Sequence, residues 1–207
     1  MTAGDRMSAF EFFFSFYGLV LGLSVAVIAT GAARAFKHRK TVKIGWKTPM
    51  LAVFVALDIA TFWDAAWMNF SSAPYSYGLL IAGLLVATVY FVATSLIFPE
   101  PDDEVQDLDA HFWANKRAIM LLLVLANLLM MSGSIWMSLP KAQGALIAGG
   151  YAFNMAIYLI LVLPAALTRR AWVFALAMGL HIALYLVLAA VSIINPAAMM
   201  ATSIGAS

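Results

Sequence analysis

The stretch Leu57 to Trp67, LDIATFWDAAW, carries two carboxylates inside a long apolar run, at Asp58 and Asp64. An Asp at the centre of a bilayer costs about 2.5–3.5 kcal/mol on insertion scales, so it is expected to face polar groups or water. A spacing of six residues places these side chains about 120° apart around a helix and about 9 Å apart along it. The spacing therefore predicts two separate features, with Asp58 at mid-membrane and Asp64 nearer one surface.

Three other apolar runs also place a strongly polar residue close to their midpoints, at Asn127, Asn154 and His181. Each lies within about 3 Å of the midpoint along the helix axis. Polar groups at one depth are expected to face each other or a wet cavity, and such a lining can bind a proton, a small polar solute or water. Residues three or four positions away share a helix face with them. The predicted substrate or proton site is Asp58, Thr61, Asn127, Asn154, Tyr158, His181 and Tyr185.

Each member also has a structural interpretation. Asn127 and Asn154 could join helices through hydrogen bonds worth about 0.6–2 kcal/mol each in membranes. His181 could be a packed, hydrogen-bonded side chain. For Asp58 the functional interpretation is favoured, because a neutral Asn would make similar contacts at lower cost. Asp64 is interpreted as a vestibule or structural residue that could meet water or Glu11 of the first apolar run.

The elements that must position these residues are membrane-spanning helices. The chain has 207 residues, of which 64% are hydrophobic and only 11% are charged, whereas soluble domains carry roughly 25% charged residues. A span needs about 20 mainly apolar residues. No ten-residue alternating segments indicate a barrel. We predict an all-α, six-helix bundle forming one transmembrane domain over residues 1–207, with helices at about 11–33, 48–70, 78–98, 118–138, 145–167 and 172–194.

The basic residues predict the orientation of the bundle. Ten of the twelve Lys and Arg residues lie in three connections: after the first run, before the fourth, and between the fifth and sixth. These connections fall on one side if all six runs span. The positive-inside rule makes that side cytoplasmic and places both termini outside. We expect an integral protein of a bacterial cytoplasmic (inner) membrane, without a cleaved signal peptide.

The connection between the third and fourth runs, FPEPDDEVQDLDAHFWANKR, is the most polar segment. Pro99 and Pro101 are expected to end the third helix. Val105, Leu108 and Phe112 recur at helical spacing, which predicts a short amphipathic helix at the cytoplasmic interface. The acidic residues here are predicted to pair with the basic first connection, although a docking or gating surface is the alternative.

Several other chemistries find little support. Zero cysteines exclude thiol relays and thiolate-held clusters on this chain. Ser132 or Ser134 with His181 would suggest an intramembrane serine protease, but their expected depths differ by about 7 Å and no nucleophile elbow is present. No cofactor is predicted, with haem at His181 as a minor alternative. Asp58, Asp64 and His181 lack metal-ligand spacing, so no metal site, catalytic residue or nucleic-acid contact is predicted.

Two classes of function remain. The first is a transporter or channel for a small solute or ion, with proton coupling through Asp58 as one form. The second is a non-catalytic scaffold, regulator or accessory subunit of a larger membrane complex. An enzyme acting on lipid, with Asp64 as its acid, is a weaker third. Partner or homo-oligomer contacts are expected at small-residue faces where helices can approach closely; these are Gly18 with Gly22, and Ala175 with Gly179 and Ala183.

Overall fold

The computed structural model describes residues 9–70, 76–100, 107–140 and 143–195, with side chains from residue 14 onward. This part of the chain is helical and contains no strand. All six helices are long and apolar enough to cross a membrane, which makes the chain an integral membrane protein. They are α1 (Ala9–Lys37), α2 (Lys47–Phe70), α3 (Tyr77–Ser95), α4 (Leu108–Ser138), α5 (Gly144–Leu167) and α6 (Ala171–Ile194).

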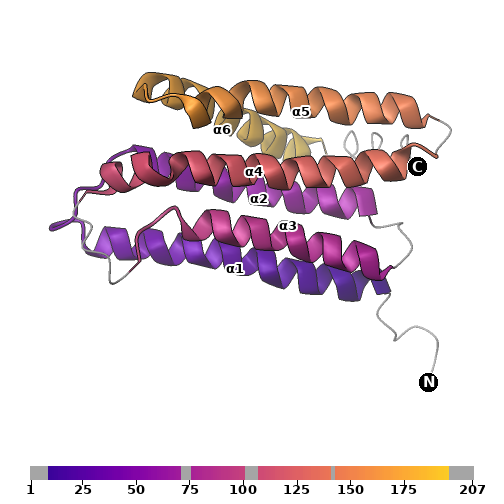
Figure 1. The fold of residues 1–207 in the computed structure, drawn as a ribbon, viewed down its shortest axis with the longest axis horizontal. Helices are drawn as coiled ribbons and strands as arrows, with labels where there is room; N and C mark the ends of the chain where they lie inside the picture. Colours follow the sequence, from indigo (N-terminus) through magenta and orange to yellow (C-terminus); the bar gives the residue numbers. More distant parts are fainter. Residues whose placement is uncertain (1–8, 71–75, 101–106, 141–142, 196–207) are drawn as a thin grey trace.

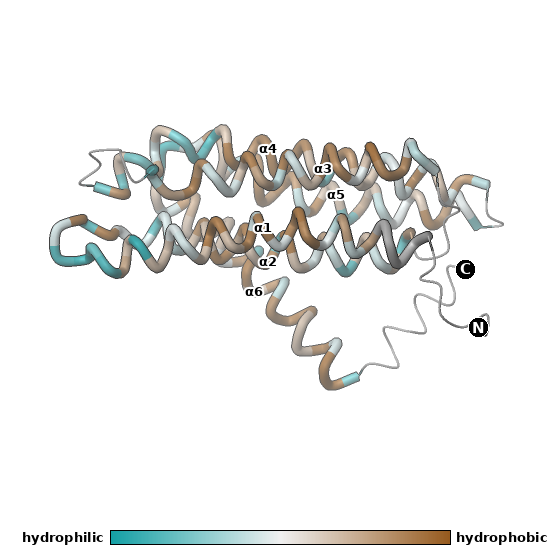
Figure 2. Tube along the Cα trace, turned by 90° about the horizontal axis from the view of Figure 1, so that it is seen from below, coloured by the Kyte–Doolittle hydropathy of each residue, from teal (hydrophilic) through white to brown (hydrophobic). Residues whose placement is uncertain are grey.

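The helices pack as an elongated bundle (Figure 1). Helix α1 lies against α3, α4 packs against both α3 and α5, and α6 contacts α5 and α2. The connections after α1 and α5, and the described residues that follow α3, lie together at one end of the bundle, on the left in Figure 1. We call this the basic end, because these are the connections that carry the predicted excess of Lys and Arg. The end is also visibly hydrophilic (Figure 2).

The connection after α1 is joined to the start of α4 at the basic end. Lys47 Nζ lies 2.5 Å from Asp109 Oδ2, with side chains only 12% and 23% exposed. Lys43 pairs at 3.5 Å with Asp107 in a more exposed contact, and the Thr48 hydroxyl donates to the Leu108 carbonyl at 3.2 Å. These contacts confirm, for two pairs, the predicted attraction between the acidic and basic segments.

The start of α4 differs from the sequence prediction. Its first turn begins at Leu108, because Asp107 is the N-cap and accepts from the Asp109 amide at 2.8 Å. That amide, followed by Lys43, holds the pKa of Asp107 below its usual range, so the cap stays charged at neutral pH. Phe112 therefore lies in the same continuous helix as Asn127, and no separate amphipathic helix is seen from Leu108 onward. Val105 lies outside the described residues.

Lys116 fastens α4 to α5. Sequence alone counts it among the connection cations, but it lies within α4 and is 3% exposed. Its ammonium donates to the Ala165 carbonyl at 2.6 Å and to the Thr168 carbonyl. Carbonyls at a helix C-terminus have no partner within the helix and attract a cation. The buried charge of Lys116 is thereby compensated by the end of α5.

Helix α6 leaves the bundle in its C-terminal half (Figure 2). His181 is its last buried residue, and the apolar side chains beyond it are largely uncovered, with Leu186 54% and Ile194 81% exposed. Such a surface is stable only against lipid or another protein. The half of α6 that follows His181 is therefore held by few contacts within the chain.

The Lys47–Asp109 pair gives a test of how the basic end is held. We expect Asp109→Asn to lower the free energy of unfolding by about 1–3 kcal/mol, because Lys47 then keeps its charge in a largely buried position. The matched control Asp107→Asn keeps an N-capping side chain and loses only an exposed pair, so its change should stay below about 1 kcal/mol. Thermal melting of the detergent-solubilised protein measures both, and equal effects would contradict the assignment.

Candidate functional site

Asp58 lies at the centre of α2 and faces the inside of the bundle, where it is 1% exposed. The Tyr90 hydroxyl of α3 donates to its Oδ2 at 2.8 Å. The Tyr185 hydroxyl of α6 donates to its Oδ1 at 2.6 Å. The Asn127 amide of α4 donates to Oδ2 at 3.2 Å. Three helices thus supply neutral hydrogen-bond donors to one carboxyl group.

Asn127 connects the remaining members of the site. Besides Asp58, its Nδ2 lies 3.2 Å from the Tyr90 hydroxyl, 3.1 Å from the Tyr158 hydroxyl of α5, and 3.0 Å from the Leu123 carbonyl. An amide group has only two N–H bonds. The four acceptors must therefore share them, and these hydrogen bonds can be redistributed without moving a helix.

His181 completes the group with an unusual environment. It is 2% exposed and packs against three rings, with centroid distances of 5.1 Å to Phe54, 5.2 Å to Tyr158 and 4.7 Å to Tyr185. Its Nδ1 is buried and has no hydrogen-bond partner, which is costly for a polar atom away from water. We call the residues gathered here the polar cluster: Asp58, Tyr90, Asn127, Tyr158, His181 and Tyr185.

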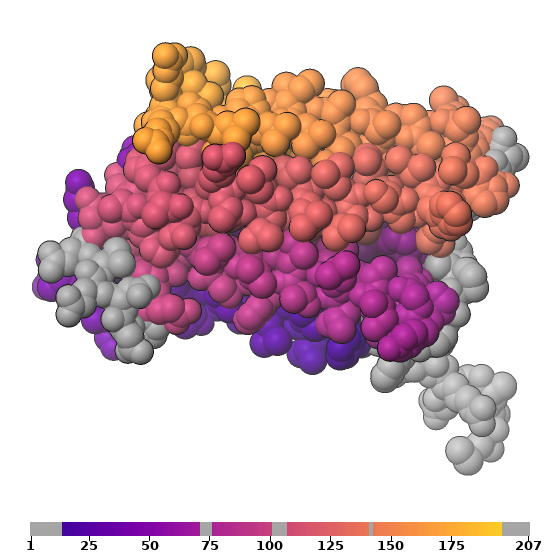
Figure 3. All heavy atoms as spheres, viewed as in Figure 1, coloured from indigo at the N-terminus to yellow at the C-terminus, as the bar shows by residue number. Residues whose placement is uncertain are grey.

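Helices α2 to α6 all contribute to the polar cluster. On the face drawn in Figure 3, α3, α4 and α5 form a continuous surface. Tyr90 and Phe62 pack edge to face at 4.9 Å on the α3 side. The cluster is therefore enclosed by packed side chains, and Tyr185 is its one member on the part of α6 that leaves the bundle.

The structure does not bring every predicted residue to this place. Thr61 is exposed, and its hydroxyl donates to the Leu57 carbonyl of its own helix at 2.9 Å. Asn154 is exposed on the outside of α5, so its predicted place beside Asp58 is wrong. Asp64 is exposed on α2, away from the buried Asp58. The Glu11 side chain lies outside the described residues.

Two features are not among the predicted site residues. Tyr90 belongs to the polar cluster, although its Cα lies about 6 Å from the middle of α3. A second hydrogen-bonded group, nearer the end opposite the basic end, joins α2, α4 and α5. There the Asn69 amide donates to the Ser134 hydroxyl at 3.1 Å and accepts from Tyr151 at 2.6 Å. Tyr151 and Tyr158 are seven residues apart on one face of α5, which is a signal that could have located both groups.

The polar cluster surrounds a carboxyl group with partners that can serve it whether it is protonated or not. Among the described residues, no ion pair involves Asp58, and a buried carboxylate without a cation is costly unless it is neutralised. Hydroxyl groups can both donate and accept, so the same tyrosines can serve either protonation state of Asp58. The described part of the chain holds no group of three His, Asp or Glu side chains suited to a metal ion.

Comparisons with known protein families, with curated proteins and with solved structures found no match to this chain. The class that the fold and the site define is a six-helix integral membrane protein with a buried polar cluster around one carboxyl group.

Two asparagines allow a direct test of the placement. Asn127→Leu should lower the free energy of unfolding by about 1–3 kcal/mol, because it leaves buried oxygens of Asp58 and Tyr158 with one donor fewer. Asn154→Leu removes the same group from an exposed position of α5 and should be neutral or slightly stabilising in a membrane. Melting of both variants in the same detergent compares them, and a larger loss for Asn154→Leu would refute the placement.

Proposed function

We propose that the protein is a proton-coupled transporter of a small solute or ion, with Asp58 as the proton-binding group. The observation that carries this proposal is the burial of Asp58 among neutral donors from three other helices, without a cation. Ionisable residues at this depth in membrane proteins are costly and typically mark ion or proton pathways. A purely structural role would be served at lower cost by a neutral side chain.

The enclosed cluster corresponds to an occluded state of such a transporter. Access to Asp58 requires that one covering element move, and α6 is the element with the least support, since its apolar side chains beyond His181 are mostly exposed. Tyr185 links this half of α6 to Asp58 through a 2.6 Å hydrogen bond. A change in the protonation of Asp58 would alter that bond, and this couples the proton to the position of α6.

Proton movement into proteoliposomes tests this role. With a pH-sensitive dye inside and a potassium diffusion potential imposed by valinomycin, the wild-type protein should change the lumenal pH faster than it changes in protein-free liposomes. The comparison is made without solute and with methylammonium as a probe solute, because neutral methylamine crosses the bilayer by itself. Asp58→Asn should abolish the signal, because an amide cannot carry the proton. The control Asp64→Asn removes an exposed carboxylate of the same helix and should stay within about twofold of wild type. Unchanged flux in Asp58→Asn would overturn the proposal.

We further propose that the basic end is cytoplasmic, with both termini outside, in a bacterial cytoplasmic membrane. Ten of the twelve Lys and Arg residues lie in the connections of the basic end or in the helix segments next to them, and this supports the orientation. Since the chain has no cysteine, maleimide labelling of a single-cysteine variant reports only the accessibility of the introduced cysteine. Lys40→Cys should resist a membrane-impermeant maleimide in intact cells, and Ser207→Cys should react with it. The reverse pattern would show the opposite orientation.

An accessory-subunit function is the second candidate, and the uncovered half of α6 is the observation in its favour. Of the predicted contact faces, Gly22 is open, whereas Gly18 faces the Trp63 ring and Gly179 lies by Met50 of α2. A partner would therefore be expected on α6 beyond His181, where Ala183 of the predicted face is exposed, and Gly22 of α1 is also accessible to one. Lack of flux in the wild-type protein, together with a stoichiometric membrane partner that is lost on Val187→Trp, would favour this function over transport.

A further inference from the structure

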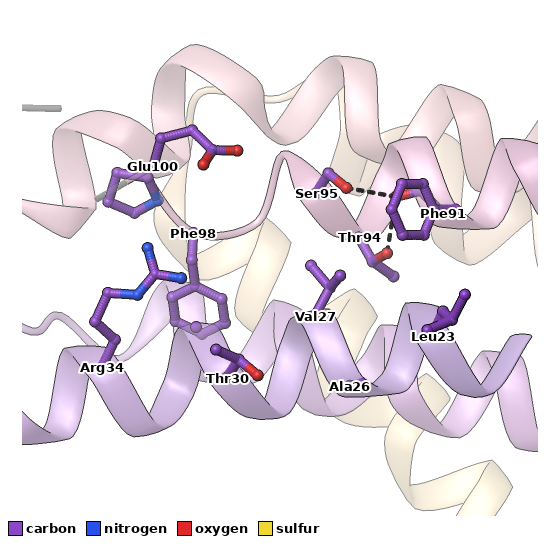
Figure 4. A pocket seen from close by; sticks show the side chains of 12 residues that line it. Leu23, Ala26, Val27, Thr30, Arg34, Phe91, Thr94, Ser95, Phe98 and Glu100 are labelled. Atoms are coloured by element: carbon purple, nitrogen blue, oxygen red, sulfur yellow. Dashed lines mark hydrogen bonds between the residues drawn. The ribbon is translucent and has the colours of Figure 1, made fainter. Parts of the chain in front are cut away.

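A second feature of the molecule lies apart from the polar cluster, between α1 and α3. A cavity of about 350 Å³ opens there near the basic end. Figure 4 shows Arg34 at one end of it and Leu23 at the other, with Val27 between them and Phe91 across from Leu23. The cavity therefore has a cationic end and an apolar remainder.

The positive charge of Arg34 favours an anionic group at this end of the cavity. Its Nη1 is buried and has no hydrogen-bond partner. The Thr94 and Ser95 hydroxyls, which also line the cavity, donate to the Phe91 carbonyl at 2.9 Å and make no hydrogen bond with this nitrogen. A guanidinium with an unused N–H group at a membrane interface is well suited to a phosphate oxygen. Glu100 also lines this end, which disfavours a doubly charged anion.

The length of the cavity and its apolar walls favour a ligand with a long apolar part. Leu23 and Arg34 are eleven residues apart, or about 16 Å along α1, which is roughly half of a ~30 Å hydrocarbon core. The groove thus runs from the basic end through about one leaflet. Its apolar walls are partly open to the membrane, with Leu23 50% and Phe91 39% exposed. The Phe98 ring packs directly on Gly31 at the floor of the cavity. This close approach requires glycine, because a Cβ there would overlap the ring.

We propose that this cavity binds a phospholipid, with the headgroup phosphodiester on Arg34 and one acyl chain along the groove between α1 and α3. A soluble anion would use only the Arg34 end, and a neutral lipid would leave the guanidinium unsatisfied. An amphiphile with a singly charged phosphate suits both the Arg34 end and the apolar groove. The site is independent of the proton-binding role of Asp58, because none of its lining residues belongs to the polar cluster.

Native mass spectrometry of the full chain, released from detergent with added phosphatidylethanolamine, tests the proposal. We expect one retained phospholipid per chain. Arg34→Gln should weaken retention about ten- to hundredfold, the size expected for a lost charge-assisted hydrogen bond, and Arg34→Lys should restore part of it. Ala26→Phe should also displace the lipid by filling the groove, since Ala26 lines it.

Matched controls separate this site from general attraction to a basic surface. Arg39→Gln removes an exposed cation outside the cavity, and Ala29→Phe adds the same ring to an exposed position outside it; both should retain lipid as the wild type does. Equal retention in wild type and Arg34→Gln would overturn the proposal. So would equal retention of diacylglycerol, which lacks the phosphate, or displacement of the lipid by millimolar inorganic phosphate, which lacks the acyl chains. Stronger retention of phosphatidate would contradict the preference for a singly charged phosphodiester beside Glu100. Melting of every variant checks that it is folded.

Discussion

The arrangement of this bundle depends on one constraint, which is that a carboxyl group at the middle of α2 must be satisfied where water is scarce. An unpaired carboxylate in a medium of low dielectric constant is too costly to keep. Helices α3, α4 and α6 each donate a hydrogen bond directly to Asp58. Helix α5 is connected through Tyr158, which accepts from Asn127. Helix packing in membranes has little hydrophobic drive of its own. The polar cluster therefore does much to specify which helices meet and at what depth, whereas α1 can be held by packing alone.

Depth is what the sequence predicts well, and rotation about the helix axis is what it predicts poorly. Apolar length and loop charge predict every span, and they predict Asp58, Asn127 and His181 at one level. Asn127 donates to Asp58, and His181 packs against Tyr185, which also donates to Asp58. Asn154 has the right depth but lies about 60° around α5 from Tyr151 and about 40° from Tyr158, and only the tyrosines face inward. In a helix that is apolar on all sides, periodicity does not reveal the buried face.

Side-chain length explains the other differences between prediction and structure. Depth was judged from Cα positions, but a tyrosine carries its hydroxyl one helical turn or more away from its Cα. Tyr90 therefore reaches Asp58 from off the midpoint of α3. The cavity at Arg34 was beyond prediction for another reason. It exists because α3 ends at Ser95 and the following Phe98 turns back onto Gly31, a tertiary contact that no local pattern contains.

Lys116 and Asp58 are both buried ionisable groups, and their partners differ in a way that bears on function. Lys116 donates to backbone carbonyls at the end of α5. Those acceptors cannot become donors, so Lys116 must donate in this contact, which fastens α4 to α5 in one arrangement. Asp58 is surrounded by hydroxyls and a shared amide, which can reorient to donate or accept. Its surroundings accommodate a carboxylate and a carboxylic acid alike, and His181 nearby keeps an unused nitrogen. A site built only for stability would need neither partners that suit both protonation states nor an unused nitrogen. A group that must gain and lose a proton while the bundle stays folded does need partners that suit both protonation states.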